Sequence, residues 1–314
     1  MNSGRKITEG GVLLALYSVL LLMTIYLPII GSILFFFLPI PFILMALKHS
    51  TAWTFGFLFI AGVLTLIFGT MFAIPLTLLM GLTGITIGYC LKREQPFIML
   101  FVNTVLVVLG MILAVLGGTS WIFKINPIDE FFTIVDTSMV KSTEILERFG
   151  QTIPKERIED VNNMFEMMNT LLPTLLVLVS AILVILFFLV SQPIIKRFST
   201  MKIQWPSFRE LQLPKSLLWY YLLTMVLTLV VNPEKTSFMY LALVNLMFIL
   251  QILILIQGYS FVFYFAHVKK WSKIIPYLVL AGSLVLPIVQ SIVRILGIID
   301  LGFSFRQSIA KKKE

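Results

Sequence analysis

Residues 71–90, MFAIPLTLLMGLTGITIGYC, decide the fold, because they form an apolar stretch with one helical face almost free of side chains. Thr77, Gly81, Gly84 and Gly88 follow one another at spacings of four, three and four residues, so they share one face of a helix. In a bilayer, such a face allows close approach between helices and gains dispersion contacts. We therefore predict that this helix lies at the centre of a membrane bundle.

The composition around this stretch is that of an integral membrane protein. Of the 314 residues, 59% are hydrophobic and only 12% are charged, and the mean hydropathy is +0.99. A water-soluble domain could not bury this much apolar surface. The net charge of +9 is carried by short segments between apolar runs, where basic residues orient helices rather than bind nucleic acid. We expect a multi-pass membrane protein with a cytoplasmic N-terminus and the lipid bilayer as its partner.

The residue supply excludes several kinds of chemistry. Cys90 is the only cysteine, and His49 and His267 are the only histidines, so no Cys/His metal site of the usual kind can be built. The sequence contains no nucleophile and base pair, no phosphate-binding loop and no paired intramembrane carboxylates. We expect neither an enzyme nor a bound metal or cofactor.

The apolar segments predict an all-α polytopic membrane protein. We assign residues 1–117 to transmembrane helices one to five, 118–169 to an extracytoplasmic amphipathic insert, 170–192 to a sixth transmembrane helix, 193–216 to a basic cytoplasmic loop, 217–299 to C-terminal transmembrane helices and 300–314 to a basic tail. In the insert, Asn126 and Pro127 are typical of a helix start and Gly150 of a helix end. Pro154 precedes a second amphipathic piece, and we expect the pair to form a cap against the outer surface of the bundle.

The end of the chain allows two topologies. Residues 274–299 are one long apolar segment with Pro287 in its middle. A single crossing gives nine spans and leaves the basic tail outside, whereas two half-helices broken at Pro287 return the tail to the cytoplasm. We favour nine crossings slightly over eight full crossings with a re-entrant pair.

Two further stripes of small residues occur in the N-terminal half. They are expected either to pack helices or to face a partner protein: Gly11, Ala15 and Ser18 in the first segment, and Gly110, Ala114 and Gly117 in the fifth. Asn103 shares a face with the second of these stripes, so its amide is expected to face protein.

Residues 8–17, TEGGVLLALY, the Pro39-Ile40-Pro41-Phe42 segment and the Lys92-Arg93 exit carry a family resemblance. Together with the small-residue third and fourth helices, they make residues 1–192 resemble the substrate-binding S components of energy-coupling factor vitamin transporters. The whole chain, including LGIID at residues 296–300, resembles the YybS family of uncharacterised bacterial membrane proteins. The resemblance implies an S-component-like six-helix bundle followed by two to four transmembrane helices or half-helices.

The same resemblance implies where partners and ligands bind. Gly11, Ala15 and Ser18 would face a coupling subunit that is linked to an ATPase, and a small molecule would bind on the outer side beneath residues 26–32 and the segment after residue 117. We take Tyr26, Asn103 and Arg294 as candidate ligand-binding residues. Asn103 could instead bond another helix, and Arg294 could snorkel or pair with Asp300.

Two functions remain open after the sequence is read. The first is a small-molecule uptake subunit of S-component type, which rests on fold analogy. The alternative is a non-enzymatic membrane scaffold or assembly protein with cell-envelope partners, as in the MreD cell-shape proteins.

Overall fold

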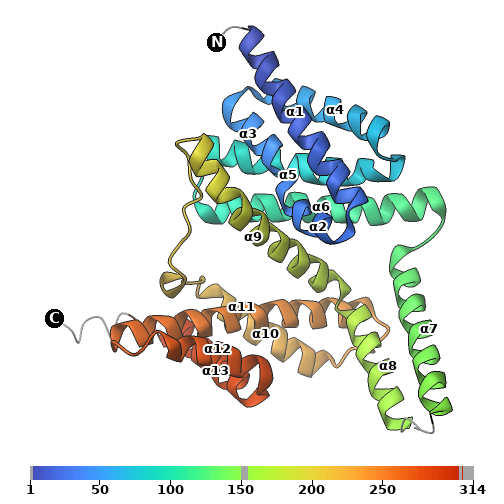
Figure 1. Ribbon diagram of the computed structural model, residues 1–314. Coiled ribbons are helices and arrows are strands. Elements are labelled where there is room, and N and C mark those ends of the chain that lie inside the picture. The colour runs from blue at the N-terminus through green and yellow to red at the C-terminus, as the bar shows by residue number, and fades with distance from the viewer. Residues whose placement is uncertain (1–2, 150–154, 304–305, 307–314) are drawn as a thin grey trace. The chain divides into compact units, whose positions relative to one another are not determined.

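The computed structural model describes residues 3–149, 155–303 and 306 of the chain, and every regular element in this part is helical (Figure 1). The chain divides into two compact units. The first unit comprises residues up to 160 and residues 176–204, and the second comprises residues 161–175 and the chain from residue 205 onward. The prediction of an all-α protein is confirmed.

The first unit contains the N-terminal helices. Their bounds are α1 Ser3–Tyr26, α2 Pro28–Leu34, η1 Phe35–Phe37, α3 Ile40–Lys48, α4 Thr51–Phe68, η2 Met71–Ala73, α5 Ile74–Lys92, α6 Phe97–Phe123 and α7 Pro127–Arg148. Helices α8, Lys155–Thr170, and α9, Leu172–Phe198, contribute residues to both units.

The bare face of α5 packs directly against α3, as the glycine spacing predicted. A Cβ atom added at Gly84 would lie 2.7 Å from the Cβ of Phe42, and one added at Gly88 would lie 2.6 Å from the Cβ of Ala46. Both distances are shorter than real Cβ contacts, so only glycine allows this approach of the two backbones. The α3–α5 pair is therefore the centre of the first unit.

A buried chain of hydroxyl groups joins three helices beside this pair. The hydroxyl of Tyr17 on α1 donates to Thr77 Oγ1 on α5 at 2.7 Å, and Thr77 Oγ1 lies 2.8 Å from Thr65 Oγ1 on α4. In an apolar environment an unpaired hydroxyl is costly, so these bonds hold the three helices in one register. Thr77 thus has a polar role on the face that the glycines keep bare.

The segment before α3 is broken into short helices, and most of its residues are exposed or half-buried. Pro28 opens α2 after Leu27 leaves helical geometry. A Cβ at Gly31 would lie 2.5 Å from the carbonyl oxygen of Thr24, so α2 folds back tightly against α1. Residues 38–47 that follow are all buried.

The other two small-residue stripes are not covered by the described chain, so of the two roles expected for them they do not pack helices within it. No atom of the described chain comes within 4 Å of a Cβ built at Gly11, Gly110 or Gly117. Ala15 on α1 and Ala114 on α6 are exposed, and Ser18 is half-buried. Within the described chain, α1 contacts α3 and α4, and α6 contacts α5, through other faces than these stripes.

The insert differs from its predicted boundaries and packing. Helix α6 continues past Gly117 to Phe123, so the insert begins only at the left-handed residue Lys124. Asn126 caps α7 as predicted, because its Oδ1 accepts a hydrogen bond from the backbone N–H of Ile128 at 3.1 Å. The described side chains of α7 are exposed or at most half-buried, so the expected cap against the bundle is wrong for this helix. Gly150 and Pro154 lie outside the described residues.

The second unit is built around one long helix. It contains η3 Phe208–Glu210, α10 Ser216–Val231, α11 Phe238–Val268, α12 Ile274–Val285 and α13 Pro287–Phe303. A Cβ at Gly258 would meet Val293 and one at Gly297 would meet Ile254, so α13 crosses α11 at a close approach of the two backbones. Asn245 of α11 also receives hydrogen bonds from the backbone N–H of Thr174, at 3.1 Å, and from its hydroxyl, at 2.7 Å.

The last apolar segment is two helices and not one. Leu286 has extended backbone geometry, and Pro287 opens α13. The favoured single crossing over residues 274–299 is therefore wrong, and the break at Pro287 agrees with the alternative. Within the described residues, seven segments are long and apolar enough to cross a membrane, while α10 and α12 are shorter apolar helices.

Candidate functional site

The predicted ligand residues of the first unit do not form one site. Tyr26 at the end of α1 is 63% exposed, and its hydroxyl lies 3.5 Å from the carbonyl oxygen of Phe68 at the end of α4. Asn103 is next to the opposite end of α5, where its amide nitrogen lies 3.3 Å from Oε1 of Gln95. Because α5 runs the length of the unit between these positions, Tyr26 and Asn103 cannot contact one small ligand.

Asn103 is exposed on α6, and its amide contacts side chains at the end of α5 and in the segment after it. Its Nδ2 also lies 3.8 Å from the sulfur of Cys90. These contacts favour the interhelical hydrogen bond over ligand binding for this amide.

Arg294 lies on α13 in the second unit and is half-buried. Its Nε is buried and has no hydrogen-bond partner in the described part of the chain. Of the alternatives for Arg294, pairing with Asp300 is not observed, because both carboxylate oxygens of Asp300 bind Arg306 instead. Helical geometry explains this result, since residues six apart point to different sides of α13.

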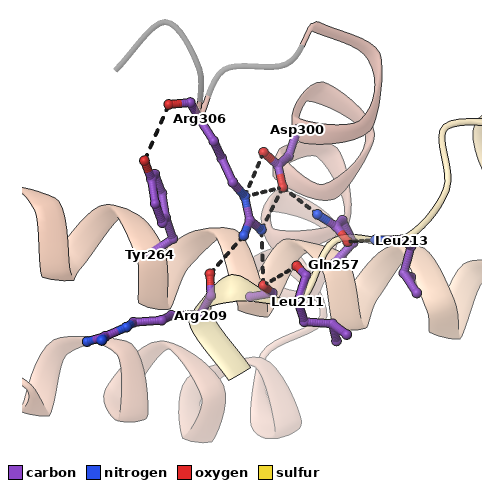
Figure 2. A network of polar contacts seen from close by, with 8 residues as sticks. Arg209, Leu211, Leu213, Gln257, Tyr264, Asp300 and Arg306 are labelled. Carbon is purple, nitrogen blue, oxygen red and sulfur yellow. Dashed lines mark hydrogen bonds and ion pairs between the residues drawn. The ribbon is translucent and has the colours of Figure 1, made fainter. Parts of the chain in front are cut away.

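The most developed polar site is the cluster around Asp300 and Arg306, shown in Figure 2. Arg306 Nε donates to the two carboxylate oxygens of Asp300 at 3.1 and 3.0 Å, and Nη2 donates to Oδ2 at 2.8 Å. The side chains of Arg306 and Asp300 are 5% and 2% exposed. A buried ion pair is stable only when further hydrogen bonds satisfy both partners.

These further bonds come from α11 and from the segment before α10. Arg306 Nη1 donates to the carbonyl oxygen of Arg209 at 2.8 Å, and Nη2 donates to Ser260 Oγ at 3.0 Å. Gln257 donates to Asp300 through Nε2 and accepts the backbone N–H of Leu213 at 2.9 Å through Oε1. The Asp300–Arg306 cluster therefore ties α11, α13 and the segment before α10 together.

The cluster leaves little room for a ligand. The adjoining cavity has a volume of about 70 Å³ and is lined in part by Gln212, Lys215 and Gln257. Because most of the donors and acceptors of the cluster bind one another, we interpret it as a structural clamp.

The sequence does not predict this clamp, because it offers Asp300 only as a partner of Arg294 and places Arg306 in the basic tail. One signal was available: Gln257 and Asp300 are isolated polar residues in apolar helices, and such residues pair within a bundle.

Comparison with known proteins agrees with this architecture. Residues 15–301 match the family described as "Predicted membrane protein (DUF2232)". A relative from Bacillus subtilis (strain 168), "Uncharacterized protein YybS", is 28% identical over 310 residues, which cover 98% of this chain and 100% of the relative. No solved structure matches the chain significantly. Since the family match spans nearly the whole chain and the helices are long and apolar enough to cross a bilayer, the chain is a multi-pass membrane protein that belongs to the DUF2232 family and is YybS-like.

Proposed function

We propose that this protein is a non-enzymatic subunit of a small-molecule uptake system, with a cytoplasmic N-terminus, and that it binds a membrane partner through α1. The observation that carries the proposal is the uncovered face formed by Gly11, Ala15 and Ser18, which we call the α1 stripe. A surface of small residues gains little from contact with lipid chains, whereas it lets the backbone of a second helix approach closely. Ser18 is compatible with such a contact because its hydroxyl already donates to the carbonyl oxygen of Leu14 at 2.9 Å.

The surface next to the stripe supports a docking role. A groove of about 490 Å³ runs along α1 and is lined mainly by apolar residues of α1, α3 and α9, among them Leu16, Ile40 and Ile194. Glu9 and Lys48 contribute polar groups to the same groove. A partner helix placed on the stripe could insert side chains into this groove, which adds van der Waals contacts to the close backbone approach.

The identity of the partner distinguishes between the uptake role and the scaffold role. A coupling subunit linked to an ATPase supports the uptake role, which the resemblance to S components suggests. The alternative, a scaffold with cell-envelope partners, is favoured by the placement of Tyr26 and Asn103 at opposite ends of α5, since they do not share a ligand site.

Replacing Gly11 and Ala15 with leucine is expected to remove the partner without unfolding the chain. Leucine is accommodated at both positions because they are open, and its bulk separates the two helices. We expect the amount of partner that co-purifies from native membranes in mild detergent to fall by about tenfold or more, equivalent to about 1.4 kcal/mol. Quantitative mass spectrometry of the purified complex measures the loss and identifies the partner.

Gly56→Leu on α4 is the matched control, because this glycine is also exposed with no atom within 4 Å of its Cβ position. The control should keep the partner. Equal recovery of the same partner with both variants would show that the α1 stripe is not the docking surface.

A further inference from the structure

A second cavity, of about 270 Å³, lies at the end of the first unit where α3 ends, α4 begins and α5 ends. The residues that matter for its chemistry are His49, Ser50, Thr51, Tyr89, Lys92 and Arg93, and we call this cavity the His49 site. None of the residues that line it is acidic. It is separate from both the Asp300–Arg306 cluster and the α1 stripe, because it shares no residue with either.

Two cationic side chains are held at the wall of this cavity. Lys92 Nζ donates to the carbonyl oxygen of His49 at 2.6 Å, which fixes the ammonium group beside the site. The guanidinium carbon of Arg93 lies 4.4 Å from the centre of the Tyr89 ring, a cation–π contact that limits its rotamers. Both residues remain exposed, and no salt bridge to an acidic residue neutralises either one in the described part of the chain.

His49 supplies an independent indication of a ligand. The residue is 4% exposed, yet neither ring nitrogen has a hydrogen-bond partner among the described residues. Nε2 lies 3.3 Å from Oε2 of Glu9, while Nδ1 has no polar partner among the described residues. Native structures leave few buried polar groups unsatisfied, and one that lines a cavity is explained when a bound group completes it.

The start of α4 adds a third favourable element. Ser50 has extended backbone geometry at the N-cap position, but no side chain caps the helix. The first N–H groups of a helix and its dipole favour an anion at this end. The hydroxyl groups of Ser50 and Thr51 can donate further hydrogen bonds to the same anion.

We propose that the His49 site binds a phosphate group, either the headgroup of an acidic membrane lipid or a soluble phosphate compound. A phosphate has several oxygens around one centre, so it can accept bonds from Arg93, Lys92, His49 and the start of α4 together. Arginine binds phosphate with two parallel bonds, and lysine binds it as a point charge. The site lies at the end of apolar helices, where lipid headgroups and aqueous anions are both accessible.

The test uses the full chain in nanodiscs and the double variant Lys92→Gln/Arg93→Gln. Glutamine at residue 92 keeps a donor for the His49 carbonyl oxygen, and residue 93 is exposed, so the variant should fold. The matched control is Lys196→Gln/Arg197→Gln, which removes the same charge from an exposed basic pair at the end of α9 that does not line the cavity.

Two arms distinguish the sources of the phosphate. In the first, inorganic phosphate is titrated against chloride of equal ionic strength in phosphatidylcholine nanodiscs, and binding is measured by calorimetry and by the rise in Tm. In the second, the chain is exposed to phosphatidylcholine vesicles with a minority of phosphatidylglycerol, and retained lipid is identified by native mass spectrometry. Binding in the first arm indicates a soluble phosphate compound, and selective retention of phosphatidylglycerol indicates a headgroup.

We expect wild type to bind in at least one arm. The Lys92/Arg93 variant should bind at least about tenfold more weakly, and the affinity of the Lys196/Arg197 control should change by less than about twofold. Wild type that binds in neither arm would overturn the proposal. So would an equal loss in the control, because binding would then depend on basic charge in general and not on this cavity.

Discussion

Replacing Arg306 with methionine is expected to destabilise the second unit by about 3–5 kcal/mol, because it leaves the buried carboxylate of Asp300 without its cation. The variant also removes the donors to Arg209 and Ser260 and the contact between the guanidinium group and the Tyr264 ring, whose centre lies 5.1 Å away. The backbone N–H of Leu213 is the local reporter, since its hydrogen bond to Gln257 depends on the same cluster. Hydrogen exchange measured by mass spectrometry should show faster exchange in peptides that contain residue 213.

Two control variants separate the charge from the loss of side-chain bulk. Arg209→Met should change the free energy of unfolding by less than about 0.5 kcal/mol, because the clamp uses only the backbone carbonyl of Arg209 and its exposed side chain pairs loosely with Glu210 at 3.5 Å. Asp300→Leu/Arg306→Met should recover most of the stability, since an apolar pair leaves no buried charge. If amide hydrogen exchange at residue 213 is as slow in the Arg306→Met variant as in wild type, the cluster does not act as a clamp.

Replacing Gly84 with leucine is expected to destabilise the first unit by about 3 kcal/mol or more, at the upper end of overpacking effects. The new side chain would meet Phe42 Cβ and the backbone of α3, and backbone cannot move aside as a flexible side chain can. Cys90 is the only cysteine and is 3% exposed, so its alkylation reports on opening of this unit. If the free energy of opening of this unit falls by about 3 kcal/mol, the rate of Cys90 alkylation should rise by about a hundredfold.

The matched control for this prediction is Gly110→Leu on α6. No atom lies within 4 Å of the Cβ position of Gly110, so the same substitution should leave alkylation of Cys90 nearly unchanged. A Gly84→Leu protein that protects Cys90 as well as the control does would contradict the tight packing of α5 against α3.

The contrast between these two glycines shows what the sequence could predict. The spacing of Thr77, Gly81, Gly84 and Gly88 is a property of one helix, so a shared face follows from helical geometry alone. Whether a neighbour covers such a face depends on the packing of other helices. The equivalent stripes on α1 and α6 have the same spacing but are open, and nothing within those segments distinguishes them from the covered one.

Boundaries and polar contacts were harder to predict for two different reasons. Helix α6 continues to Phe123 because Trp121, Ile122 and Phe123 extend its apolar character, whereas the predicted end relied on Gly117, which a helix can contain. The Asp300–Arg306 clamp depends on Arg209, 97 residues away from Arg306 in the sequence, and on a carbonyl group that carries no side-chain signal. Closeness in sequence made Arg294 a possible partner of Asp300, but helical spacing points the two side chains to different sides of α13.

The central claim of this account is that the open α1 stripe is a docking surface for another membrane protein. The most direct test places a photo-crosslinking amino acid at residue 15 and, as a control, at residue 56 on α4, and irradiates intact native membranes. The account predicts a covalent adduct with one specific protein from residue 15 and none from residue 56. If residue 15 is cross-linked only to lipid and to no protein, as is expected for residue 56, the α1 stripe is not a docking surface.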